Sequence, residues 1–127
     1  MAVREIRLFG DPVLKTVSDP VQVFDDKIKA LIADLVETTQ LPGRAGVAAP
    51  QIGVNIRAFS YNVNGKVGYL INPEITELSG EKILVDEGCL SVPGMRGVVP
   101  RYSRLHYTGF DQFGQPIDRL VSGFHAR

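Results

Sequence analysis

Only one stretch of this chain has the spacing of an amphipathic helix, and most of the chain after it has the pattern of strands. Apolar residues recur three and four positions apart at Ile28, Leu31, Ile32, Leu35 and Val36. This spacing places them on one face of a helix, which we expect to pack on a sheet. Asp25 or Asp26 can cap the start of the helix, and Pro42-Gly43 predicts its end.

Beyond residue 51, turn signals divide the chain into short predicted strands, at 57–62, 66–71, 75–78, 81–85, 102–110 and 115–121. Asn64-Gly65 predicts a tight type I′ hairpin, and Ser79-Gly80 a second hairpin. Ser122 can cap a final helix, of which residues 122–127 would be only a stub. One helix followed by antiparallel strands predicts an α+β fold with short antiparallel sheets, and residues 1–127 form one domain.

Composition narrows the class of function. Fourteen basic residues balance fourteen acidic ones, so the chain shows no electrostatic signal for nucleic acid. No apolar run reaches the roughly 20 residues that span a bilayer, and the first residues show no secretory signal. The single cysteine, Cys89, fits a reducing compartment. We therefore expect a cytoplasmic protein.

Residues 46–53, Gly-Val-Ala-Ala-Pro-Gln-Ile-Gly, lie between the predicted helix and the first strand. A row of small residues lets another backbone or a ligand come close. Two interpretations stay open for Gln51. The segment is a closely packed connection, or the Gln51 side chain is an amide donor to a developing oxyanion.

Residues 87–94, Glu-Gly-Cys-Leu-Ser-Val-Pro-Gly, form the second unusual segment. A lone cysteine is most often a small buried hydrophobic residue. Gly88 and Pro93-Gly94, however, predict a loop with special backbone geometry around Cys89. A cysteine held in such a loop can bind a metal ion as thiolate or act as a nucleophile.

These two segments resemble the first two signature motifs of the peptide deformylase family, Gly-apolar-Gly-apolar-Ala-Ala-x-Gln and Glu-Gly-Cys-Leu-Ser. They occur in the same order as in that family. Further similarity lies at residues 9–14, 72–73, 99–101 and 122–127, so the resemblance covers essentially the whole chain. Such enzymes remove the formyl group from the N-terminal formylmethionine of new proteins, which implies formylmethionyl peptides as partners and work near the ribosome.

The resemblance also implies a metal site and roles for individual residues. The metal is ferrous iron, with zinc, nickel or cobalt as substitutes, and Cys89 matches one ligand. Gln51 and the Leu90 amide match the groups that stabilise the oxyanion, and Gly46 matches a backbone contact to the substrate. The matched substrate-binding positions are Ala45, Val85, Gly88 and Phe124, and Glu87 matches a structural residue beside the metal loop.

The sequence departs from the family pattern in two places. Arg44 stands where the first glycine of the first motif is expected, and Arg is disfavoured at positive φ. The third motif, a His-Glu-x-x-His helix with two metal ligands and the general base, does not occur in these residues. The two histidines, His106 and His125, do not stand four residues apart. We therefore expect this 127-residue chain to be inactive and metal-free by itself, with the final helix missing or reduced to a stub.

Three origins of this departure stay open: a degenerate enzyme, one piece of a split or cleaved enzyme, or a sequence that ends before the protein does. The alternative function is a non-catalytic module that binds formylmethionyl or methionyl peptides, or a partner chain. A cysteine-nucleophile enzyme would need a histidine beside Cys89. Loss of the third-motif helix would expose apolar surface, so we expect a dimer, a partner or marginal stability.

Overall fold

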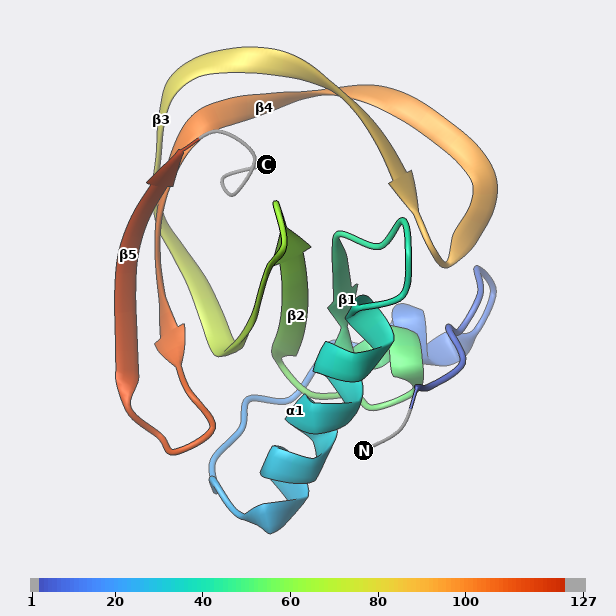
Figure 1. The fold of residues 1–127 in the computed structure, drawn as a ribbon, viewed down its shortest axis with the longest axis vertical. Coiled ribbons are helices and arrows are strands. Elements are labelled where there is room, and N and C mark those ends of the chain that lie inside the picture. The colour runs from blue at the N-terminus through green and yellow to red at the C-terminus, as the bar shows by residue number, and fades with distance from the viewer. Residues whose placement is uncertain (1–2, 123–127) are drawn as a thin grey trace.

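The computed structural model describes residues 3–122 as one helix on a five-stranded sheet (Figure 1). The elements are η1 (Pro12–Leu14), α1 (Asp26–Thr39), β1 (Gly46–Ala48), η2 (Ala49–Ile52), β2 (Ala58–Val63), β3 (Lys66–Cys89), β4 (Val92–Phe110) and β5 (Pro116–Ser122). The strand order is β1-β2-β3-β4-β5, and every neighbouring pair is antiparallel. This architecture confirms the α+β prediction. It differs in having one continuous sheet rather than several short ones.

Helix α1 begins where the sequence predicts. The Asp25 carboxylate accepts a hydrogen bond from the Ile28 N–H at 3.2 Å, so Asp25 is the N-cap. The helix ends at Thr39, before the Pro-Gly pair. Arg44 donates to the Thr38 carbonyl at 3.1 Å and so satisfies one of the last carbonyls of the helix.

The backbone at Arg44 follows an ordinary path. Among the described residues other than glycine, positive φ angles occur at Asn64 and Asn72. Arg44 therefore lies outside the left-handed region, and the departure from glycine at this position costs no backbone strain.

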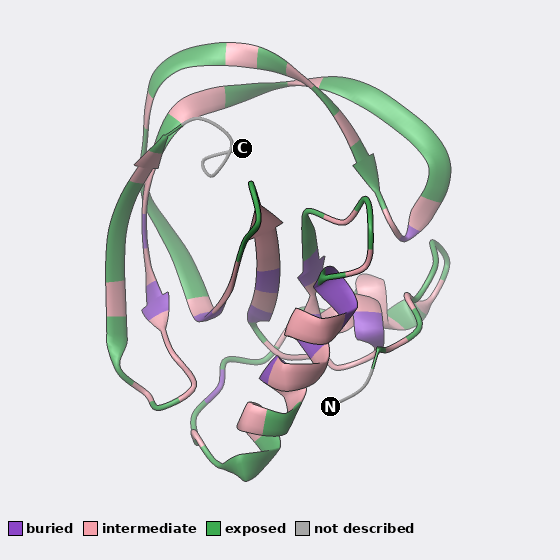
Figure 2. Ribbon diagram, viewed as in Figure 1, coloured by how far each residue is buried: buried purple, intermediate pink, exposed green. Residues whose placement is uncertain are grey.

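The hydrophobic core lies between α1 and the start of the sheet, as the buried segments of Figure 2 show. Ile32 and Leu35 of α1 are buried there, as the periodicity predicts. The whole cluster comprises Val21, Ile32, Leu35, Val47, Ala49, Ile52, Ala58 and Ile71. Burying each large apolar side chain contributes about 1.5–3 kcal/mol. This core fixes β1 and η2, and therefore the first unusual segment, to the rest of the fold.

The hairpin predicted at Asn64-Gly65 is present between β2 and β3. Both residues have positive φ, 52° at Asn64 and 78° at Gly65, as a type I′ turn requires. The register pairs Val63 with Lys66 directly across the turn.

The prediction of a hairpin at Ser79-Gly80 is wrong, because β3 continues through these residues. Ser79 pairs with Arg104 and Lys82 with Tyr102, so two residues of β3 face one residue of β4. This is a β-bulge. Gly80 has a φ of 78°, and an added Cβ would lie 2.2 Å from the Ser103 hydroxyl oxygen. The Ser-Gly pair that looked like a turn is therefore a bulge inside a long strand.

Strands β3 and β4 form a long curved ladder that arches away from the core (Figure 1). We call the part from Lys82 to Arg101 the arch. Cys89 pairs with Val92 at its end, and Leu90-Ser91 is the connecting turn. The curvature brings this turn back beside the N-terminal segment.

The last predicted turn is present, but the helix cap after it is not. The Asp111 carboxylate accepts from the Phe113 and Gln115 N–H groups at 2.8 and 3.0 Å, and this closes the turn into β5. Ser122 ends β5 and pairs with Arg104, so it is a strand residue rather than a helix cap. Residues 1–2 and 123–127 lie outside the described part of the chain.

A buried hydroxyl network joins α1 to the sheet, and its loss should destabilise the fold. The Ser60 hydroxyl is fully buried, contacts the Thr39 hydroxyl and donates to the Leu35 carbonyl at 3.0 Å. We expect Ser60→Ala to lower the free energy of unfolding by about 1–3 kcal/mol, because it leaves buried polar groups with fewer partners. Urea denaturation measures this change. Thr16→Ala is the control, since it removes an exposed hydroxyl that also bonds a backbone carbonyl. Equal midpoints for the two variants would contradict the prediction.

Candidate active site

The local fold at Gln51 holds its side chain in place. Gln51 lies in η2, and its Oε1 accepts a hydrogen bond from the N–H of Ala48, the residue that caps this turn, at 2.9 Å. Gly53 ends η2 with a φ of 86°, and the Arg7 guanidinium lies where a Cβ would be. The positive φ favours glycine here, because other residues rarely adopt this backbone conformation. The row of small residues is therefore a closely packed turn that presents Gln51.

Cys89 is the last residue of β3 and a free, exposed thiol. An added Cβ at Gly88 would lie 3.0 Å from the Arg96 guanidinium and 3.4 Å from the Met95 carbonyl. The ladder shifts register between Gly88 and Cys89, where residues 93–95 of β4 have no partner in β3. The Pro-Gly pair thus produces a register shift rather than the chain reversal. Cys89 is accordingly not the buried core residue that a lone cysteine usually is.

The tertiary structure brings the two unusual segments together. Gln51 Nε2 lies 3.7 Å from Cys89 Sγ and 3.2 Å from Ser91 Oγ. Residues 7–9 of the N-terminal segment form one backbone hydrogen bond to each of these two segments. The Arg7 N–H donates to the Gln51 carbonyl at 2.6 Å, and the Phe9 N–H donates to the Ser91 carbonyl at 2.7 Å. An amide donor and a thiol therefore face one another at a fixed separation.

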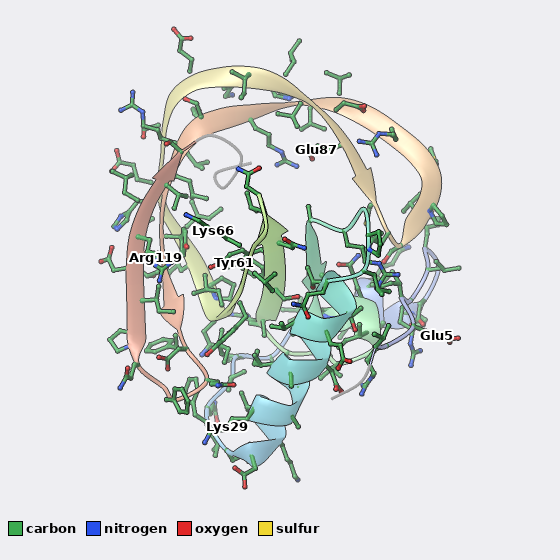
Figure 3. All side chains as sticks on the ribbon, viewed as in Figure 1. Glu5, Lys29, Tyr61, Lys66, Glu87 and Arg119 are labelled. Carbon is green, nitrogen blue, oxygen red and sulfur yellow. The ribbon has the colours of Figure 1, made fainter. Side chains whose placement is uncertain are left out.

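Glu87 lies on the inner side of the arch (Figure 3) and forms a two-pronged ion pair with Arg101. The two N–O distances are 2.6 and 2.7 Å. The hydrogen bonds from Arg101 lower the pKa of Glu87 and raise the pKa of Arg101. The pair joins β3 to β4 just before Cys89. The structural role of Glu87 beside the metal loop stays a prediction.

The other predicted residues lie in several parts of the fold. Gly46 begins β1, an edge strand, and the carbonyl of Ala45 accepts from the Asn62 N–H at 2.8 Å. Val85 is half-buried in the arch, and Leu90 packs against the core cluster. Phe124 lies outside the described residues. Their predicted substrate-binding and oxyanion roles stay predictions.

His106 is far along the sheet from Cys89. The register pairs it with Glu77, whereas Cys89 pairs with Val92 at the other end of the ladder. Its ring nitrogens contact the Thr76 hydroxyl and the Asp118 carboxylate. His125 lies outside the described residues. Among residues 3–122, therefore, no histidine is placed to activate Cys89 as a nucleophile or to join it at a metal.

The donor groups of the described residues do not fit a complete metal site. A thiolate is a good ligand for iron or zinc, and Cys89 is accessible. However, within residues 3–122 no group of three or more His, Cys, Asp or Glu side chains could hold a metal ion. The described part of the chain thus offers one ligand of a site.

An apolar groove of about 340 Å³ lies on the face of the sheet away from α1. Leu105 and Tyr107 of β4 alternate with residues of the opposite face, as Phe59 and Tyr61 do in β2. The lining residues are Phe59, Tyr61, Val63, Leu70, Pro73, Glu74, Ile75, Leu105 and Tyr107. Burial raises the pKa of Tyr107.

The helix in the described part of the chain, α1, has neither the length nor the apolar character needed to span a bilayer.

The structure defines an α+β chain that brings a glutamine amide to a cysteine at the end of a strand, and comparison with known proteins shows its family. The family model for polypeptide deformylase matches residues 3–127. The chain is 52% identical over 127 residues to a peptide deformylase of Acidothermus cellulolyticus, covering all of this chain and 70% of that protein. It is 46% identical over 136 residues to peptide deformylase 2 of Ralstonia nicotianae, covering 98% of this chain and 77% of that protein.

The structural comparison agrees. The crystal structure of peptide deformylase from Thermotoga maritima matches with a TM-score of 0.94 and 35% identity, covering all of this chain and 86% of that one. The chain belongs to the polypeptide deformylase family.

Sequence reasoning did not single out two residues of this site. Ser91 is the last residue of the second motif and had no predicted role. It is 4% exposed, and its hydroxyl oxygen accepts a hydrogen bond from Gln51 Nε2. Arg7 lies in a segment without periodicity and holds Gln51 through its backbone. A hydroxyl residue two positions after the cysteine, in the same motif, was the available sequence signal for Ser91. The backbone contact of Arg7 has no side-chain signature.

The Glu87–Arg101 pair predicts a measurable pKa effect. We expect Arg101→Met to raise the pKa of Glu87 toward its ordinary value, because the donor that stabilises the carboxylate is lost. A carboxyl ¹³C titration of Glu87 measures this shift. In the wild type the folded-state pKa lies below the unfolded one. The pair therefore stabilises the fold above the unfolded-state pKa, and this contribution is lost as pH falls through the folded-state value.

Arg96→Met is the matched control, since Arg96 pairs with Asp86 on the exposed side of the same ladder. It should leave the Glu87 titration unchanged. An equal shift in both variants would show that general charge removal, and not this hydrogen-bonded pair, sets the pKa.

Proposed function

We propose that this chain contributes the Gln51–Cys89 part of a peptide deformylase active site, which hydrolyses the formyl group of N-terminal formylmethionine. The observation that supports this proposal is the placement of Gln51 Nε2 at 3.7 Å from Cys89 Sγ. Attack on a formyl carbonyl creates negative charge on oxygen, and a preorganised N–H donor stabilises that charge. The Leu90 N–H, next to Cys89 in the turn, is the second proposed donor.

The edge strand β1 is the proposed docking site for the peptide backbone. Among the described residues, β1 pairs with β2 on one side only, so its other side has no strand partner. The Ala48 N–H at the end of this edge already donates to Gln51 Oε1. An extended peptide can add to such an edge as a further strand. Gly46 is exposed and has no side chain to obstruct this approach. Ala45, Val85, Gly88 and Phe124 are the proposed contacts around the methionine side chain.

The proposed metal is iron, with Cys89 as one ligand. The described residues supply this single ligand. The residues of this chain orient the peptide on β1 and donate hydrogen bonds to the formyl oxygen. We propose a cytoplasmic location near the ribosome, where formylated chains emerge.

A second candidate function is peptide or partner binding without turnover. The apolar groove favours it, because it offers contact area that needs no metal or general base. Binding of formyl-Met-Ala with no release of formate would support this function over catalysis by the chain alone.

A hybrid protein tests the deformylase proposal. In it, this chain replaces the matched 70% of the Acidothermus cellulolyticus relative. With added Fe²⁺ under reducing conditions, we expect the hybrid to release formate from formyl-Met-Ala. The 127-residue chain alone should not, because its described residues hold one metal ligand. Gln51→Ala in the hybrid should lower kcat by about 10²–10³, the usual loss for one oxyanion donor.

Two comparisons complete this test. Cys89→Ala should abolish activity, whereas Gln40→Ala, on the exposed end of α1, should not change it. A folded hybrid that binds metal and does not release formate would refute the proposed function.

The groove also predicts self-association of the isolated chain. Ile75 lines the groove and is 61% exposed. We propose that a second copy covers this surface, since exposed apolar patches of this kind mark interaction sites. Sedimentation should show a dimer that Ile75→Glu dissociates. Leu120→Glu is the control, because Leu120 is 70% exposed and lies on the opposite face of the sheet. A stable monomer with a high melting temperature would contradict this prediction.

A further inference from the structure

We propose that Ser91 is a positioning residue whose hydroxyl holds the Gln51 carboxamide with Nε2 facing Cys89. The inference rests on the proposed function for its consequence in catalysis, but its structural core does not depend on activity. It follows from three features of the site: the fixed oxygen of the Gln51 carboxamide, the acceptors near its nitrogen, and the rigidity of the Ser91 backbone.

The oxygen end of the Gln51 carboxamide is fixed first. Oε1 accepts a hydrogen bond from the Ala48 N–H at 2.9 Å. A carboxamide carries its acceptor on one side and its two N–H donors on the other. The bond to Ala48 therefore selects the orientation in which Nε2 points away from β1 and toward the turn after β3.

The nitrogen end has two neighbours of unequal strength. Nε2 lies 3.2 Å from Ser91 Oγ and 3.7 Å from Cys89 Sγ. A hydroxyl oxygen is the better acceptor, because sulfur is a weak one. Ser91 thus holds one N–H of Gln51. The second N–H remains on the side of Cys89, where a formyl oxygen would lie in the proposed reaction.

Ser91 is itself held rigidly. It is 4% exposed, and its carbonyl accepts from the Phe9 N–H at 2.7 Å. Two residues earlier in the same segment, the Arg7 N–H donates to the Gln51 carbonyl at 2.6 Å. Both partners of the Gln51–Ser91 contact are therefore fixed to one stretch of backbone. Without the hydroxyl, the Gln51 carboxamide would be held only at its oxygen end, by the Ala48 N–H, and its nitrogen end would gain freedom to move.

This freedom has a cost for a hydrogen-bond donor in catalysis. A donor that is oriented before the reaction stabilises the developing charge without reorganisation. A Gln51 amide that is held only at its oxygen end would spend part of its time with the N–H groups displaced from the side of Cys89. We therefore expect loss of the Ser91 hydroxyl to lower kcat and to leave KM nearly unchanged, because the peptide binds mainly elsewhere.

The first test observes Gln51 directly in the 127-residue chain by NMR. Gln51→Glu, which lacks the side-chain amide, assigns the two Nε2 proton signals. In the wild type, we expect one of them to exchange slowly with water and to show a nuclear Overhauser effect to the Ser91 methylene. In Ser91→Ala, this proton should exchange about ten times faster, because the hydrogen bond that protects it is absent.

Two further variants separate positioning from general stability. Ser91→Thr retains the hydroxyl and should restore slow exchange, while Ser91→Cys retains the size with a weaker acceptor and should not. Ser18→Ala is the control, since the Ser18 hydroxyl takes no part in the Gln51 contacts. Equal Gln51 shifts and exchange rates in wild type, Ser91→Ala and Ser91→Cys would overturn the proposal.

The second test measures kinetics in the hybrid described above. Ser91→Ala should lower kcat about tenfold, less than the about 10²–10³ expected for losing the Gln51 donor outright. KM should change less than about twofold, and Ser91→Thr should recover the rate. An active hybrid whose kcat is unaffected by Ser91→Ala would overturn the positioning role. If the wild-type hybrid is inactive, the proposed function fails, and the NMR result alone decides whether Ser91 orients Gln51.

Discussion

Two backbone hydrogen bonds from the N-terminal segment hold the site of this protein together. Arg7 donates to the carbonyl of Gln51, and Phe9 donates to the carbonyl of Ser91. The first bond holds η2, and the second holds the turn between β3 and β4 at the end of the arch. Leu90 also packs against the core cluster, so core contacts and these two bonds together hold the turn after β3 beside Gln51. The separation of the glutamine amide and the cysteine thiol depends on these two bonds.

The curvature of the β3–β4 ladder is the second condition for the site. A flat ladder of this length would carry Cys89 far from the core. The bulge at Gly80 and the register shift before Cys89 disrupt regular pairing, and such irregularities bend and twist a strand. The Glu87–Arg101 pair then joins the two strands near the end of the arch. Backbone irregularity and one ion pair thus direct an exposed thiol toward Gln51.

The predictions from sequence succeeded where local patterns determine structure. The helix cap at Asp25 and the type I′ turn at Asn64-Gly65 are both present. Prediction was wrong at Ser79-Gly80 and at Ser122, and in both places pairing with a distant strand decided the outcome. At Ser79-Gly80, the sequence indicates a glycine with positive φ. A hairpin turn and a β-bulge can both use this conformation, so the pattern does not distinguish them. At Ser122, the residue that could cap a helix pairs with Arg104 instead.

By itself, the sequence determined the fold class, the helix face and the two segments that carry chemistry, because periodicity and residue chemistry are local properties. It also fixed the departure at Arg44 and the absence of a His-Glu-x-x-His pattern from these residues. The tertiary structure decided which groups meet. The contact of Gln51 with Ser91 and Cys89 joins residues about 40 positions apart, through a segment that has no pattern of its own. Such contacts arise from packing and backbone hydrogen bonds across the whole fold, and no local sequence pattern encodes them.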